Sequence, residues 1–207
     1  LFNKPSLAKG EYYLLQHFKG WIVETADSVF DTEQATLMDF RPSQNHGTTF
    51  VYVMPFSPKQ ALIEYTLFTA DLLQEEDYHK GLSDYVNNVM GLKNWAIKEE
   101  EFGIIPMTNH RFRRREGSIL NIGTAGGRTK ASSGYTFRFI QKDTADIINR
   151  MRKTGTPFAA SYGYSRFDWY DSVLLNIPTH KTLQGDSIFN DLFKNKKKKK
   201  ILKFLDN

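Results

Sequence analysis

Apolar and polar residues alternate between residues 12 and 69, and this period of two predicts β-strands. The segments that show it are residues 12–18, 20–25, 35–40, 48–55 and 61–69. Turn-forming residues separate them, as in Ser57-Pro-Lys-Gln60. Because strands joined by short turns pair antiparallel, the pattern predicts an antiparallel sheet.

The period changes after residue 70. Apolar residues at three-to-four spacing predict a helix over residues 71–90, which Gly81 weakens and Gly91 ends. Strands are expected at residues 95–102 and 118–122, and helices at residues 133–152, 166–176 and 187–194. The helix at 133–152 is amphipathic, because one side carries Phe137, Ile140, Ile147, Ile148 and Met151.

A glycine-rich segment, Asn121-Ile-Gly-Thr-Ala-Gly-Gly-Arg-Thr-Lys-Ala-Ser-Ser-Gly-Tyr-Thr-Phe137, lies between the strand at 118–122 and the helix expected from residue 133. Backbone amides in such a loop and at a helix N-terminus favour negative charge. The segment therefore predicts a site for a phosphate or for a cofactor with an anionic ring. The strand–GxGxxG–helix unit that begins a dinucleotide site does not occur in the sequence, so only part of such a site is expected.

Composition indicates a globular chain, with 40% hydrophobic and 14% aromatic residues over 207 positions. With no cysteine, disulfides and thiolate metal sites are excluded. The five histidines show no ligand spacing, so no metal site is expected. The apolar runs are too short to span a bilayer. The sequence begins at Leu1, and we expect it to be a portion of a longer protein.

The net charge of +5 comes from a lysine run at residues 196–200, beside Lys194. A solvated tail is one reading of this run. Attraction to an anionic membrane surface is another, because Ile201, Leu202, Phe204 and Leu205 follow. Nucleic-acid binding is not expected, since no basic platform with interleaved aromatic residues accompanies the run.

Glu64 is the most informative single residue. Alternation along residues 61–69 places it on one face with Leu62, Thr66 and Phe68. Burial among such neighbours raises a carboxyl pKa, and a neutral acid of this kind can give a proton to carbon. The other reading is a polar residue on a half-exposed sheet. Asp39, at the end of a strand, is either a second carboxylate of the same cavity or a turn former.

Five segments, taken together, resemble the flavin-dependent lycopene cyclases, in particular the bacterial, flavobacterial-type branch. They are Leu37-Met-Asp-Phe-Arg41, Phe50-Val-Tyr-Val-Met-Pro-Phe-Ser57, Ala61-Leu-Ile-Glu-Tyr-Thr-Leu-Phe68, Glu100-Glu-Phe-Gly-Ile-Ile-Pro-Met107 and residues 122–137. Their order and spacing are similar to the part of that family that follows its N-terminal FAD motif.

The resemblance implies an α+β fold of the flavoprotein monooxygenase type. On this basis residues 1–110 are expected to form an antiparallel-sheet substrate-binding domain. Residues 111–155 are expected to be the C-terminal part of an FAD-binding domain, and residues 156–207 a helical tail with the lysine run.

The resemblance also implies carotenoid biosynthesis, in which the ψ ends of lycopene become β-rings through γ-carotene to β-carotene, without net redox change. The cofactor is reduced FAD, with NAD(P)H as the reductant, and the enzyme is cytoplasmic and peripheral to the inner membrane. Glu64 corresponds to the family's candidate acid, with Asp39 as a second catalytic candidate. The expected cofactor-binding residues are Gly123, Thr124, Ala125, Gly126, Gly127, Ser133, Gly134 and Tyr135.

The chain departs from the family pattern in places. Tyr65 stands where the family often has a second acidic residue, and Thr124 where many FAD proteins have an acidic one. Arg128 and Lys130 either lean towards phosphate or face solvent. The alternatives are another FAD-dependent enzyme of this scaffold, such as a prenyl reductase or hydroxylase, and a non-catalytic lipid- or carotenoid-binding fragment. As a portion, the chain alone is expected to be inactive.

Overall fold

The computed structural model describes residues 4–159, 163, 166–180, 185–195 and 199–201. The chain divides into two compact units. One comprises residues 15–105 and 181–191, and the other residues 1–14, 106–180 and 192–207. Each unit is considered by itself, and the predicted division at residues 110 and 155 stays a prediction. Most of the lysine run, residues 196–198, lies outside the described residues.

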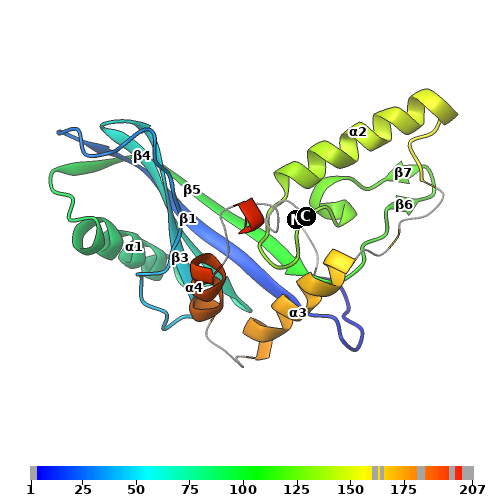
Figure 1. The fold of residues 1–207 in the computed structure, drawn as a ribbon, viewed down its shortest axis with the longest axis horizontal. Helices are drawn as coiled ribbons and strands as arrows, with labels where there is room; N and C mark the ends of the chain where they lie inside the picture. The colour runs from blue at the N-terminus through cyan, green and yellow to red at the C-terminus, as the bar shows by residue number, and fades with distance from the viewer. Residues whose placement is uncertain (1–3, 160–162, 164–165, 181–184, 196–198, 202–207) are drawn as a thin grey trace. The chain divides into compact units, whose positions relative to one another are not determined.

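A sheet with strand order β2-β3-β4-β1-β5 dominates the structure (Figure 1). Its strands are β1 (Tyr13–Thr25), β2 (Thr36–Asp39), β3 (Thr48–Ser57), β4 (Gln60–Thr69) and β5 (Trp95–Thr108). The pairs β1–β4, β2–β3 and β3–β4 are antiparallel. This confirms the predicted α+β class with an antiparallel sheet. The two segments expected at 12–18 and 20–25 form one continuous strand.

One face of this sheet is covered by α1 (Glu75–Asp84) and the π-helical turn η1 (Tyr85–Val89) (Figure 1). Gly81 permits the close approach, since a Cβ there would lie 2.5 Å from the Tyr65 ring. The glycine that weakened the predicted helix at 71–90 is therefore the point where the helix meets the sheet. The core on this face comprises Trp21, Val23, Phe30, Val51, Val53, Ala61, Ile63, Tyr65, Leu67, Tyr78, Leu82, Tyr85 and Val86.

The opposite face carries an aromatic cluster. Phe50 contacts Tyr52 and Phe68 edge to face, with ring centroids 5.3 and 5.0 Å apart. Phe189 of α4 (Gly185–Asn195) stacks on Phe40 and also meets Phe68. Alternation therefore separates an aliphatic and aromatic core on the α1 face from a second, largely aromatic layer on the other face.

The second unit contains a short hairpin, β6 (Arg115–Glu116) and β7 (Ile119–Leu120), followed by the 3-10 turn η2 (Gly123–Gly126). Two helices follow, α2 (Phe137–Thr154) and α3 (Arg166–His180). The prediction that a helix begins at Ser133 is wrong, because residues 130–135 form a closed turn. Lys130 N–H donates to Tyr135 O at 2.8 Å, and Gly134 lies in the left-handed region at φ +71°.

The apolar side predicted for α2 exists, but it is exposed. Phe137 is 72% exposed and Met151 is 52% exposed, while Asp143 is the buried residue of this helix. Among the described residues, no helix is long and apolar enough to cross a membrane.

Candidate functional site

Glu64 lies at the middle of β4, between two neighbouring strands. It pairs with Gly20 of β1 and Tyr52 of β3, so its side chain leaves the sheet on the aromatic face. The Thr66 hydroxyl donates a hydrogen bond to Glu64 Oε1 at 2.8 Å. Burial raises the pKa of Glu64 to about 7, against a smaller lowering by the Thr66 hydrogen bond.

A carboxyl group with this pKa is about half protonated at neutral pH, whereas an ordinary glutamate is almost fully ionised. It can therefore act as a general acid near pH 7. The apolar and aromatic surroundings disfavour the charged form.

Asp39 is in a different environment. Its carboxylate pairs with Arg41, whose Nε lies 2.8 Å from Oδ2, and accepts a hydrogen bond from the Tyr85 hydroxyl at 2.6 Å. Burial raises the pKa of Asp39, but hydrogen bonds from Arg41 and Tyr85 outweigh it and leave the pKa below its usual value. Asp39 pairs with Val51, the neighbour of Tyr52, so its side chain leaves the opposite face from Glu64. The structure does not bring the two carboxylates together.

The glycine loop is shaped by residues outside it. Gly123 and Gly127 both have positive φ, +57° and +68°. A Cβ at Gly126 would lie 2.2 Å from Arg114 Nη1 and 2.3 Å from Asn121 O, so this glycine makes room for protein groups. Arg114 in turn binds both carboxylate oxygens of buried Asp143 on α2, each at 2.7 Å.

The two basic residues of the loop are held by carboxylates. Arg128 Nε lies 3.1 Å from Asp143 Oδ1, and buried Lys130 Nζ lies 2.8 Å from Asp171 Oδ1 on α3. Of the two readings given above for these residues, solvent-facing is wrong for Lys130, whose side chain is 1% exposed. Both cations hold the loop to the helices that follow it.

Ser133 and Gly134 are buried beside the start of α2, and Tyr135 is half-buried. The Ser133 hydroxyl is 1% exposed and has no hydrogen-bond partner among the described residues. No acidic residue lies in the first turn of α2, and no side chain caps it. The helix N-terminus is therefore not neutralised by an acidic side chain of its own first turn.

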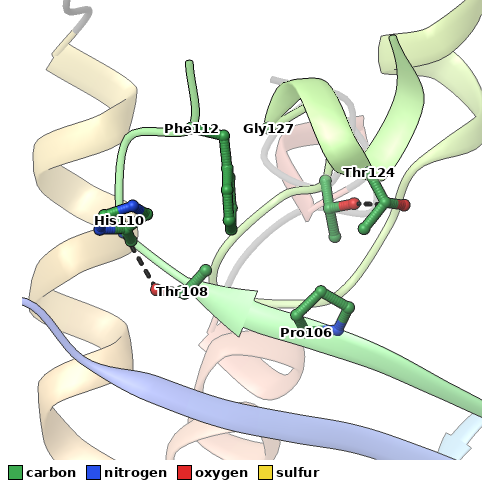
Figure 2. A pocket seen from close by; sticks show the side chains of 7 residues that line it. Pro106, Thr108, His110, Phe112, Thr124 and Gly127 are labelled. Carbon is green, nitrogen blue, oxygen red and sulfur yellow. Dashed lines mark hydrogen bonds between the residues drawn. The ribbon is translucent and has the colours of Figure 1, made fainter. Parts of the chain in front are cut away.

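A small cavity opens beside the loop, as Figure 2 shows. It is lined by Pro106, Thr108, His110, Phe112, Thr124, Gly127 and Thr129. Sequence reasoning identified Thr124 and Gly127 and missed Thr129 and the four from 106 to 112. The signal for those four was Pro106 within a strand, since proline in a sheet is confined to edge strands and strand ends, and β5 is an edge strand.

These residues fit one end of a flavin nucleotide. The left-handed glycines allow close backbone approach, and a helix N-terminus without an acidic first turn suits an anionic ring. The cavity measures about 20 Å³, which suits an edge contact, not enclosure of a whole dinucleotide. The loop offers contacts for one end of FAD and none for the remainder of the cofactor.

The fold is shared with a solved structure described as a geranylgeranyl bacteriochlorophyll reductase-like protein from Thermoplasma acidophilum. The TM-score is 0.54 at 11% sequence identity, over 88% of this chain and 46% of that one. The α+β scaffold is therefore one that also occurs in a longer protein.

The sequence model described as Lycopene cyclase protein matches residues 3–207, and the chain belongs to this family. Relatives include lycopene beta cyclases of Narcissus pseudonarcissus, 28% identical, and Nicotiana tabacum, 31% identical. Each alignment covers 128 residues, which is 56% of this chain and 25% of the relative. The chain thus matches about a quarter of the length of these relatives. The predicted family resemblance is confirmed.

Proposed function

We propose that this protein contributes the acid site of a lycopene cyclase, which closes β-rings on the ψ ends of lycopene to give γ-carotene and then β-carotene. The observation that carries the proposal is Glu64, a half-buried carboxyl with a pKa of about 7 in a chain of the cyclase family. An enzyme that protonates a hydrocarbon needs a neutral acid of this kind in a water-poor pocket.

In the proposed reaction, the Glu64 carboxyl gives its proton to the terminal double bond of the substrate. This leaves a tertiary carbocation, which the neighbouring double bond attacks to close a six-membered ring. Loss of a proton completes the β-ring, so the reaction has no net redox change. The substrate gains one proton at the first step and loses one at the last, so the product is an isomer of the substrate.

The aromatic face that surrounds Glu64 suits this cation. Phe50, Tyr52 and Phe68 lie on the same face of the sheet. The faces of aromatic rings attract positive charge by about 0.5–2 kcal/mol each, more where water is excluded. These rings are almost fully buried against Phe40 and Phe189, so they form an apolar wall beside Glu64.

Gly123, Thr124, Ala125, Gly126, Gly127, Ser133, Gly134 and Tyr135 are the proposed contacts for the cofactor. Reduced FAD, regenerated by NAD(P)H, would supply negative charge that stabilises the cation. Gly126 acts indirectly in this proposal, because it seats Arg114. Asp39 is the second catalytic candidate in this proposal. It would act as an ionised carboxylate that is bound to Arg41. The carotenoid substrate resides in lipid, so we propose a cytoplasmic enzyme peripheral to the inner membrane.

Replacement of Glu64 tests the proposal. The complete gene product is expressed in bacteria that accumulate lycopene, and the carotenoids are separated by chromatography. Glu64→Gln keeps the size of the side chain and removes the acid, and we expect β-ring formation to fall by about 100-fold or more. Glu76→Gln, at an exposed position of α1, is the matched control and should leave the products unchanged. Full ring formation by Glu64→Gln would remove Glu64 as the acid.

A prenyl-chain reductase is the second candidate, because the similar solved structure is described as geranylgeranyl reductase-like. The two differ in electron balance. A reductase oxidises one reduced cofactor for each double bond that disappears, whereas a cyclase isomerises its substrate. Product mass separates them, since a cyclised product has the mass of lycopene and a reduced one is heavier by two hydrogens for each bond.

A further inference from the structure

Strand β1, which lies between β4 and β5, has a glycine and therefore no side chain at position 20. Gly20 of β1 pairs with Glu64 in the sheet, and β5 is the next strand on its other side. A Cβ on Gly20 would lie 2.7 Å from Glu101 Cγ and 2.8 Å from Glu101 Oε1. The side chain of Glu101 therefore occupies the space above Gly20 where a β1 side chain would stand.

This gap allows two carboxyl groups to meet across an intervening strand. The side chain of Glu101 reaches Glu64 by a hydrogen bond as well as by charge. Two neighbouring carboxylates repel each other unless they share one proton. With any larger residue at position 20, this contact would be blocked.

The other groups around Glu64 do not neutralise it. Thr66 on β4 donates one hydrogen bond, Tyr52 on β3 is its paired neighbour, and Gly20 on β1 has no side chain. Lys19 is engaged elsewhere, 2.6 Å from Glu100 Oε2. Among the described residues, Glu101 is the charged group that acts on Glu64.

We propose that Glu64 and Glu101 form a proton-sharing carboxyl pair across Gly20, in which exposed Glu101 connects half-buried Glu64 to solvent and returns a proton to it after each turnover. The proton-return role deepens the proposed function and rests on it. The existence of the carboxyl pair does not depend on the proposed function. Tyr65, which stands where the family often has a second acid, lies in the core on the α1 face. Glu101 provides a second carboxyl on the face of Glu64, from a different strand.

The carboxyl of Glu64 can be titrated directly by carbon NMR on protein labelled at glutamate side chains. In Glu101→Gln the neighbouring negative charge is lost, so we expect the pKa of Glu64 to fall by about one unit. Glu99→Gln is the matched control, because it removes the same charge from an exposed position of the same strand, and it should leave Glu64 unchanged.

Gly20→Ala provides a second test that keeps both acids. The backbone at Gly20 is not in the left-handed region, and the nearest atoms to an added Cβ all belong to side chains, namely Glu101 Cγ and Oε1 and, at 3.1 Å, Leu62 Cδ1. Alanine should therefore move Glu101 aside without disturbing the sheet, and the pKa of Glu64 should again fall. An unchanged Glu64 titration in Glu101→Gln or in Gly20→Ala overturns the pair, whatever the activity.

The turnover step has its own readout. In the lycopene assay, we expect Glu101→Gln to slow ring formation and to move its pH profile downwards with the pKa of Glu64, and Glu101→Asp to restore part of the rate. If Glu64 titrates as described but the complete protein forms no rings, the proposed function fails and the pair stands. If rings form with an unaltered pH profile in Glu101→Gln, the proton-return role fails.

Discussion

At the scale of single residues, alternation along β4 was sufficient to predict the face of Glu64. The strand is regular and its pairing with β1 and β3 keeps register through Glu64. For Asp39 the sequence left two readings open and could not choose its face, because Met38 has a positive φ of 54° and the β2–β3 register shifts between Thr36 and Asp39. A shift of one residue moves a side chain to the other face, and no local pattern announces it.

The raised pKa of Glu64 also makes a prediction about stability. A carboxyl whose folded pKa lies above its unfolded value stabilises the fold fully below pH 4.5, and this contribution is lost as pH rises through about 7. We therefore expect Glu64→Gln to be more stable than the wild type at pH 8 by about 1–2 kcal/mol after solvent screening, with the difference shrinking at pH 5. Urea midpoints at both pH values measure this, and a variant less stable at pH 8 would contradict it.

At the scale of elements, a buried histidine ties three of them together. His17 on β1 is fully buried, and its ring nitrogens meet the Tyr78 hydroxyl on α1 at 2.5 Å and Thr69 Oγ1 on β4 at 2.6 Å. Burial lowers the pKa of His17 to about 4, against a smaller raising by a hydrogen bond to the Asp71 backbone carbonyl. The sheet and α1 are thus joined by a neutral imidazole.

A group whose pKa is lower in the folded state loses stability as pH falls, here between 6.5 and about 4. We expect urea unfolding to require less urea as pH falls through this range, in opposition to the trend from Glu64. His17→Gln should be less stable at pH 7 by about 1–3 kcal/mol and should show a smaller decline towards pH 4.5. His46→Gln, at an exposed position, should decline like the wild type. Equal declines in the two variants would exclude His17 as the source.

Element boundaries show where sequence reasoning stopped. The strands at 48–55 and 61–69 were predicted nearly to their ends, because each strand's own residues favour the pleated surface. The start of α2 was missed by several residues, because the closed turn at 130–135 depends on Lys130 reaching Asp171 on α3. The cavity residues from Pro106 to Phe112 were missed for the same reason: their partners are distant in sequence.

At the scale of the whole molecule, α2 leaves an apolar stripe in solvent. Phe137, Ile140, Ile148 and Met151 are all exposed. Contiguous apolar surface of this kind promotes association. We expect the 207-residue chain, expressed alone, to sediment as concentration-dependent oligomers, and Ile148→Lys with Met151→Lys to give a monomer. Asn149→Lys, at an exposed position of α2 outside this stripe, is the control. A wild-type chain that stays monomeric at high concentration would contradict the expectation.

The buried ion pair between Arg114 and Asp143 has a consequence for how the glycine loop behaves before any ligand arrives. Salt does not screen this pair effectively, because both side chains are almost fully removed from solvent. Arg114 holds Gly126 through its carbonyl at 3.3 Å, so the loop keeps its shape without help from a bound molecule. A loop ordered in advance loses little conformational entropy when it binds. If the loop binds the proposed cofactor, its affinity therefore depends on the groups that meet the ligand and not on folding around it.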